Sequence, residues 1–196
     1  MDILLLAGSP SAPSRSTRLL HHAGDRLASL GHQVDKLNVV NLPAHALLHA
    51  DFADPELIKA QAQVERAQAV VIATPVYKAA YSGILKTFLD VLPQNGLAGK
   101  LVLPLATGGS PAHMLALDYA LRPVLSSLSA RHILPSIYAI DAQILWDDAQ
   151  GLTLDALLEQ RLARGIENLS ASLHALRESA PGEFTSIPFS QVRCSV

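Results

Sequence analysis

The segment AVVIA at residues 69–73 is apolar at every position. A strand that faces water on one side alternates apolar with polar residues, so a continuous apolar run indicates a strand that is covered on both faces. Such strands lie inside parallel sheets, with the connecting helices packed on each side. This segment therefore favours an α/β architecture. Other apolar segments predict four further strands, at residues 2–7, 34–39, 101–106 and 133–140.

Helical patterns separate these strands. In the first of them, apolar residues recur at helical spacing from Leu19 to Leu30, and Gly31 ends the pattern. Further helices are expected at residues 55–68, 83–92 and 115–128, and one or two closing helices at 152–177.

The alternation of strands and helices also predicts the topology. With right-handed crossovers it gives a flavodoxin-like three-layer sandwich around a five-stranded parallel sheet in the order 2-1-3-4-5. We expect one domain over residues 1–178. An irregular tail is expected over 179–196, because Pro181, Gly182 and Pro188 fall there without a sustained period.

Composition excludes several classes of partner. Of the 196 residues, 49% are hydrophobic and 16% are charged, which favours burial between the subunits of a homo-oligomer. A net charge of −2 without a Lys or Arg cluster argues against nucleic acid. No apolar stretch approaches the roughly 20 residues of a membrane helix, and Asp2 stands where a secretory signal carries a cation. We therefore expect no membrane contact and a cytoplasmic location. The single cysteine, Cys194, offers neither a disulfide nor a thiolate metal site.

The segment after the first predicted strand is rich in hydroxyl groups. It contains Ser9, Arg15, Ser16 and Thr17 just ahead of a helix, where hydroxyl donors, free backbone N–H groups and the helix dipole favour an anion such as a phosphomonoester. The alternative interpretation is a serine-rich helix cap with a solvated Arg15. Neither GxGxxG nor GxxxxGK[ST] occurs in the chain, which disfavours a classical dehydrogenase or NTPase.

A second loop, at residues 74–83, follows the third strand and is expected at the same edge of the sheet. It combines Pro75, aromatic residues, small residues and a glycine. Its backbone N–H groups are suited to the polar edge of a flavin, with apolar side chains beside the ring. Taken singly, Tyr77 and Tyr81 are each more simply interpreted as half-buried aromatics with a solvated hydroxyl.

A third loop, at residues 107–113, follows the fourth strand. Its two glycines let main-chain amides approach a ligand closely. His113 is open to two interpretations, a hydrogen-bond partner of a ring or sugar and a plain surface residue. The other histidines show no HExxH or comparable spacing, so no metal site is predicted.

A resemblance to a known family is carried by LLLAGSPSAPSRST, IATPVYKAAYSGILKTFLD and LPLATGGSPAHMLALDYALRPVLS, which cover most of residues 1–140. These segments resemble the flavodoxin-like NAD(P)H-dependent FMN reductases, most closely the reductase of the two-component alkanesulfonate monooxygenase system. The resemblance implies FMN as the cofactor, with NADPH or NADH as the reductant. It implies phosphate binding by Ser9, Arg15, Ser16 and Thr17, contact of Pro75, Val76, Tyr77 and Lys78 with the isoalloxazine and ribityl groups, and Thr107, Gly108, Gly109 and Ser110 along the far side of the ring.

The resemblance also bears on assembly and flavin exchange. Members of the family are typically homo-oligomers, often tetramers, and the helix that matches residues 115–128 lies at a subunit interface. In close relatives this helix carries a π-type insertion at a tyrosine that matches Tyr119, associated with flavin that is exchanged rather than retained. The resemblance fades after about residue 141, so no functional residue is assigned beyond it.

These features predict an NAD(P)H:FMN oxidoreductase that passes reduced FMN to an FMNH2-dependent monooxygenase in sulfonate sulfur assimilation. Hydride transfer is cofactor chemistry, so no catalytic side chain is expected. The alternatives are an FMN-bound quinone or azo-compound reductase and a flavodoxin-type electron carrier. The sequence does not separate NADH from NADPH, because neither a ribose-binding acid nor a 2′-phosphate arginine can be placed.

Overall fold

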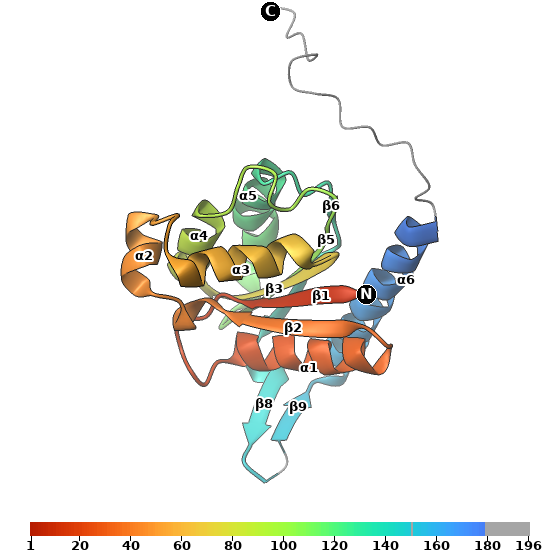
Figure 1. Cartoon of the computed structure of the whole chain (residues 1–196). Coiled ribbons are helices and arrows are strands. Elements are labelled where there is room, and N and C mark those ends of the chain that lie inside the picture. Colours follow the sequence, from red (N-terminus) through yellow and green to blue (C-terminus); the bar gives the residue numbers. More distant parts are fainter. Residues whose placement is uncertain (150, 179–196) are drawn as a thin grey trace, which may run out of the picture.

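The computed structural model of the chain describes residues 1–149 and 151–178 (Figure 1). Its strands lie in the order β2-β1-β3-β5-β6, with β7 also paired to β5, and all of these pairings are parallel. Because β5 is the fourth parallel strand along the chain and β6 and β7 together form the fifth, the predicted 2-1-3-4-5 order is confirmed. The strands are β1 (Asp2–Ala7), β2 (Gln33–Asn38), β3 (Ala69–Tyr77), β5 (Leu101–Gly108), β6 (His132–Ile133) and β7 (Ile137–Ile140).

The fifth predicted strand is interrupted between β6 and β7. Leu101 in β5 pairs with His132 in β6, and Leu105 pairs with Ile137 in β7. Pro135 lies in the break, and Pro104 lies in the stretch of β5 between these two pairings. Proline has no N–H to donate to a ladder, so the two prolines account for the gap.

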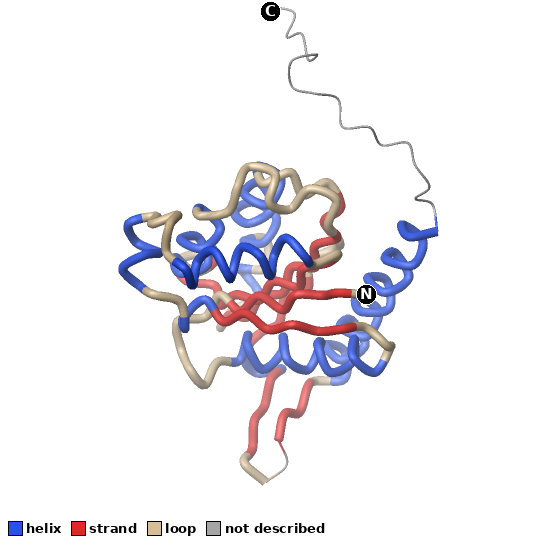
Figure 2. Tube along the Cα trace, in the orientation of Figure 1, coloured by secondary structure: helices blue, strands red, loops and turns tan. Residues whose placement is uncertain are grey.

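Helices cover both faces of the sheet (Figure 2). On β1, Ile3 and Leu5 pack toward α1 and α6, whereas Leu4 and Leu6 pack toward α3 and α4. The sheet therefore separates two apolar cores, as the predicted three-layer sandwich requires. One face carries α1 (Arg15–Ser29) and α6 (Ala156–Glu178), and the other carries α2 (Ala44–His49), α3 (Pro55–Arg66), α4 (Gly83–Asp90) and α5 (Arg122–Ser127).

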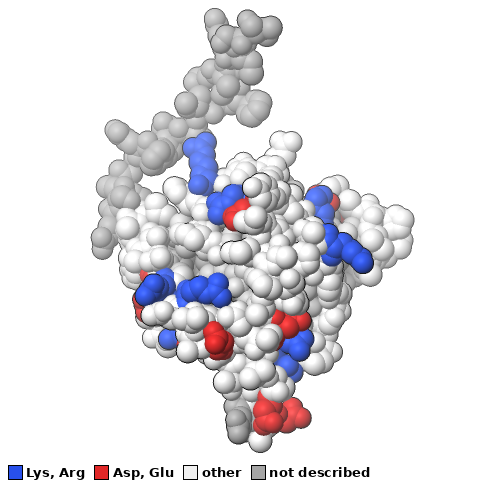
Figure 3. All heavy atoms as spheres, turned by 180° about the vertical axis from the view of Figure 1, so that it is seen from behind, with Lys and Arg blue, Asp and Glu red and all other residues white. Residues whose placement is uncertain are grey.

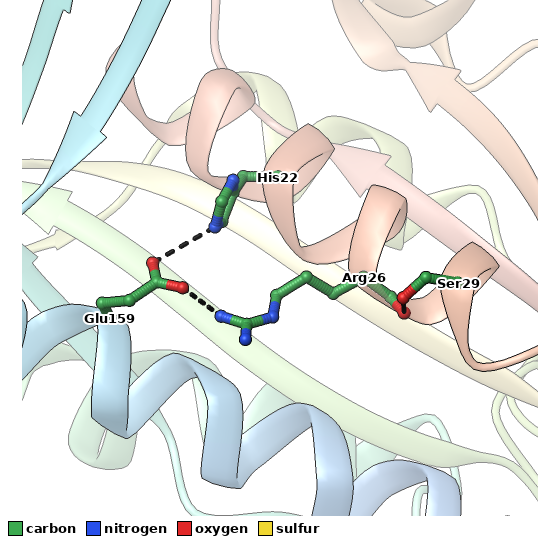
Figure 4. Close-up of polar contacts among 4 residues, drawn as sticks. All are labelled: His22, Arg26, Ser29 and Glu159. Atoms are coloured by element: carbon green, nitrogen blue, oxygen red, sulfur yellow. Dashed lines mark hydrogen bonds and ion pairs between the residues drawn. The ribbon is translucent and has the colours of Figure 1, made fainter.

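A polar cluster joins α6 to α1 (Figure 4). Glu159 on α6 accepts a hydrogen bond from Arg26 on α1, and its second carboxylate oxygen lies 3.2 Å from His22 Nε2. Ser29 Oγ donates to the Arg26 carbonyl at 2.7 Å. This cluster, together with the buried leucines of α6, holds the last described helix against the α1 layer.

Three features depart from the sequence-based predictions. The short helix α2 and the two-residue strand β4 (Ala80–Tyr81) were not predicted. The closing helix expected from residue 152 is wrong at its start, because β9 (Gly151–Leu154) pairs antiparallel with β8 (Ile144–Asp147). The helix begins only after Asp155, whose Oδ1 accepts from the backbone N–H groups of residues 157 and 158 at 3.1 and 3.3 Å, and such a cap fixes a helix start.

The surface carries few charges. On the face drawn in Figure 3, basic and acidic side chains are scattered over a mostly uncharged surface. Over the two described stretches of chain, no helix is both long enough and apolar enough to cross a bilayer. The irregular tail predicted at 179–196 lies outside the described residues.

Candidate functional site

Three loops meet at the carboxyl edge of the sheet. They follow β1, β3 and β5, which are neighbours in the sheet. Gly8 N donates to the Ala73 carbonyl at 2.8 Å, and Ser82 Oγ donates to the Gly8 carbonyl. At the same edge, Pro75 at the end of β3 pairs with Thr107 in β5. Parallel strands end on the same side, so this convergence follows from the strand order, as the sequence predicts.

The first loop presents hydroxyl groups ahead of α1. Ser14 caps the helix, with its Oγ accepting from Thr17 N at 3.4 Å and lying 2.9 Å from Ser16 Oγ. Ser9 and Ser16 are buried, and Ser9 Oγ accepts from Ser11 N at 3.2 Å. The first turn of α1 contains no acidic residue. The helix cap is thus present, and the N–H groups and dipole of the helix face these hydroxyl groups as an anion would require.

Arg15 lies at the rim of this loop. Its side chain is 54% exposed, and its Nη1 lies 3.7 Å from Asp141 Oδ2. An exposed pair at this separation contributes little to stability, so the guanidinium is available to a ligand phosphate. Sequence reasoning missed Asp141, because this residue lies where the family resemblance fades and only the strand order brings it to Arg15.

The second loop is a tight hairpin between β3 and β4. Its turn residues, Lys78 and Ala79, have φ values of 50° and 63°. Two-residue hairpins favour positive φ at both turn positions, a conformation uncommon for residues other than glycine. Tyr77, which ends β3, is 48% exposed. The hairpin therefore holds Tyr77 and Lys78 at an open rim.

Buried hydroxyl groups anchor the base of this hairpin. Thr74 Oγ1 accepts from Ser82 N at 3.0 Å, and Ser82 Oγ caps α4 by accepting from Leu85 N at 3.3 Å. Both hydroxyl residues are buried. Tyr81 is half-buried, and burial raises the pKa of its phenol. The pair Thr74 and Ser82 supports the site, and only the structure shows that the two residues meet.

Tyr138 on β7 holds the third loop. Its hydroxyl donates to the Ser110 carbonyl at 2.6 Å, and a Cβ on Gly108 would come within 2.3 Å of that hydroxyl. A Cβ on Gly109 would meet nothing closer than Asp141 Oδ2 at 4.0 Å. Burial raises the pKa of Tyr138, and the Asp141 carboxylate raises it further. The phenol therefore stays a neutral donor. Sequence reasoning missed Tyr138 because the residue that it contacts, Ser110, lies in the loop after a different strand, β5.

A π-helix at Leu117–Leu121 precedes α5, where the resemblance implies a π-type insertion. Leu117 and Leu121 are buried, whereas Tyr119 is 79% exposed. The π-helix contacts β4 and so borders the second loop. Local π-helices are frequent at functional sites.

The three loops fit FMN in the chemistry of their donors. Hydroxyl, guanidinium and helix N–H groups match a phosphate. Val76 lies near Gly108, with its Cβ 3.5 Å from the position of a Cβ added to Gly108, so an apolar side chain adjoins a glycine backbone. Thr107 is buried and His113 is exposed. Within residues 1–149 and 151–178, no group of three or more His, Cys, Asp or Glu is placed to hold a metal.

The fold and these loops define a flavodoxin-like FMN protein. Comparison with known proteins is more specific: the chain belongs to the NADPH-dependent FMN reductase family, whose family model matches residues 1–144. It is 47% identical over 174 residues to the FMN reductase (NADPH) of Escherichia coli strain K12, covering 89% of this chain and 91% of the relative. The NADH-dependent FMN reductase SfnE of Pseudomonas putida is 31% identical over 92% of this chain and 98% of the relative.

A solved structure agrees with this assignment. The apo form of the NADH:FMN oxidoreductase EMOB superposes with a TM-score of 0.79 at 38% identity, over 87% of this chain and 89% of that one. The chain is therefore an NAD(P)H:FMN oxidoreductase that uses FMN with NADPH or NADH, as the sequence predicts.

Proposed function

We propose that this reductase supplies reduced FMN to a separate FMNH2-dependent monooxygenase in sulfonate sulfur assimilation, in the cytoplasm. The open rim of the site carries the proposal. Arg15 and Tyr77 are 54% and 48% exposed. Small-molecule sites that retain their ligand bury most of its surface, so a rim with this exposure favours exchange of the flavin over retention.

The proposed flavin site lies in one flavodoxin-like domain over residues 1–178. The buried hydroxyl groups of the first loop and the start of α1 support a phosphate subsite, and the glycine backbone of the third loop supports a ring subsite. The phosphate subsite comprises Ser9, Arg15, Ser16 and Thr17, and the ring and ribityl subsite comprises Pro75, Val76, Tyr77, Lys78, Thr107, Gly108, Gly109, Ser110 and His113.

The side chains of the site bind and orient rather than transfer protons. When bound, FMN supplies the hydride-accepting chemistry. Arg15 and the N–H groups of α1 would hold the phosphate and so position the ring. Backbone N–H groups of the second and third loops would serve its polar edge, and Tyr138 keeps the third loop in place through Ser110. Positioning of two rings is sufficient for hydride transfer, so no catalytic side chain is assigned.

An exposed apolar stretch supports assembly as a homo-oligomer, a tetramer or a dimer. Met114, Leu115 and Tyr119 are 54%, 51% and 79% exposed and lie on or next to the π-helix. Contiguous apolar surface is typical of interaction sites. Burial of this stretch between copies would place the π-helix at an interface. The position of Tyr119 within the π-helix supports it as the flavin-exchange residue. Sedimentation velocity tests this, and a monomer over the working concentration range would contradict it.

Steady-state kinetics with flavin-depleted protein test the function. FMN should enter the rate as a saturable second reactant. Addition of an FMNH2-dependent alkanesulfonate monooxygenase, an alkanesulfonate and O2 to the reductase with NADPH and FMN should release sulfite. Tightly retained FMN with saturation by a quinone or azo acceptor would instead establish the quinone reductase alternative. Absence of NAD(P)H oxidation would favour the electron-carrier alternative.

The phosphate subsite has its own test. Arg15→Ala should weaken FMN binding roughly tenfold, because a charge-assisted hydrogen bond is lost at a partly exposed position. Arg66→Ala, on an exposed arginine at the far end of α3, is the matched control and should leave FMN affinity unchanged. Equal affinities in the two variants would move the phosphate away from Arg15.

A further inference from the structure

A cationic and aromatic surface lies beside the first loop, outside the proposed flavin site. Arg18 follows Arg15 by one turn on α1, and its Cζ lies 4.0 Å from the centroid of the Trp146 ring. Trp146 belongs to β8, in the hairpin that projects from the core beside α1 (Figure 1). It is 47% exposed although the guanidinium covers part of it. A large part of the indole therefore remains open to solvent.

Arg18 keeps its charge available. Over the described residues, it forms no ion pair. The carboxylates near the hairpin are already engaged: Asp148 Oδ1 accepts from Trp146 Nε1 at 3.1 Å, Asp147 Oδ1 accepts from a backbone N–H at 2.8 Å, and Asp141 pairs with Arg15. The contact to Asp148 also fixes the plane of the indole.

Short stretches of chain connect the Arg18 and Trp146 surface to the loops of the proposed flavin site. Asp141, at the rim of the first loop, opens the 3-10 turn Asp141–Gln143 that leads directly into β8. Arg18 lies on the same helix as the proposed phosphate subsite. A reduced nicotinamide nucleotide is a long molecule, so when its nicotinamide lies on the flavin its adenosine end can reach protein outside the flavin site. The Arg18 and Trp146 surface stands at that boundary.

We propose that Trp146 and Arg18 bind the adenosine 2′-phosphate end of NADPH. Adenine stacks on the open part of the indole, and the guanidinium pairs with the 2′-phosphate. NADH has a hydroxyl in place of that phosphate, so the contact favours NADPH over NADH. The inference rests on the reductase activity. It uses the proposed flavin site only because the Arg18 and Trp146 surface lies near that site. Delivery of flavin to a monooxygenase plays no part in it.

Intrinsic fluorescence gives a direct test, because Trp146 is the single tryptophan of the chain. The full chain, freed of FMN, is titrated with adenosine 2′,5′-bisphosphate or with 5′-AMP, with excitation beyond the adenine absorption band. Both nucleotides should change Trp146 emission, and the bisphosphate should bind at least about tenfold more tightly. Arg18→Gln should bring the two affinities within about twofold of each other. The control Arg66→Gln should leave the wild-type difference intact.

Kinetics supply a second readout. In Arg18→Gln, the ratio of kcat/KM for NADPH to that for NADH should fall about tenfold. Unchanged emission, equal affinity of the wild type for both nucleotides, or an unchanged ratio would show that the Arg18–Trp146 contact only packs the hairpin. If Arg18→Gln weakens FMN binding as much as it weakens binding of the bisphosphate, Arg18 belongs to the flavin site instead. Failure of the monooxygenase proposal would leave all of these titrations as expected, so the two tests are distinguishable.

Discussion

Gly108→Ala tests how the third loop is held against the sheet. The added Cβ would come within 2.3 Å of the Tyr138 hydroxyl and 3.3 Å of its Cζ. Tyr138 is only 7% exposed and donates to the Ser110 carbonyl at 2.6 Å, so the ring cannot move aside without losing that bond. Overpacking costs about 1–3 kcal/mol, and the hydrogen bond contributes about 0.5–1.5 kcal/mol. We therefore expect the free energy of unfolding to fall by about 1.5–4.5 kcal/mol.

Two further variants isolate the cause. Gly109→Ala meets no atom closer than 4.0 Å and should cost less than about 0.5 kcal/mol. Tyr138→Phe removes the atom that clashes, so Gly108→Ala should cost at least about 1 kcal/mol less in that background. Urea unfolding of the FMN-free proteins, followed by circular dichroism, measures the free energy of unfolding of the two glycine variants, of Tyr138→Phe and of the double variant Gly108→Ala with Tyr138→Phe. Equal losses from the two glycine substitutions, or additive losses in the double variant, would refute the reasoning.

Other expectations concern the supports of the site. Ser82→Ala removes the α4 cap and the bond to the Gly8 carbonyl, and should lower the free energy of unfolding by about 1–3 kcal/mol; a loss below about 0.5 kcal/mol would contradict this. Deletion of Tyr119 should shorten the π-helix to a regular helix and slow FMN release on dilution, whereas an unchanged release rate would argue against an exchange role. Burial lowers the pKa of His32, so the unfolded chain takes up a proton first as the pH falls. Stability due to a neutral His32 is therefore complete above the unfolded pKa of about 6.5 and decreases as the pH falls from there toward the folded pKa. Thermal unfolding between about pH 8 and pH 5 should show a smaller decline in His32→Gln, and an equal decline would contradict the assignment.

The sequence by itself determined the layered sheet and the edge at which the loops gather. Both are local properties, because the apolar run at 69–73 indicates a strand buried on two faces and helical spacing indicates the crossovers that make the strands parallel. The three loops follow from strand direction alone. The sequence also indicates that these loops are rich in hydroxyl groups and glycines, since the composition of a loop does not depend on contacts between distant residues.

Only the tertiary structure decided which distant residues meet at that edge. Tyr138 reaches Ser110, Asp141 reaches Arg15, and Arg18 reaches Trp146, each across a long stretch of chain. The hairpin of β8 and β9 also escapes sequence reasoning, because strands of four residues are too short to be told from helix by periodicity. Such contacts depend on register and on how each strand is packed, and no local pattern in the sequence encodes them.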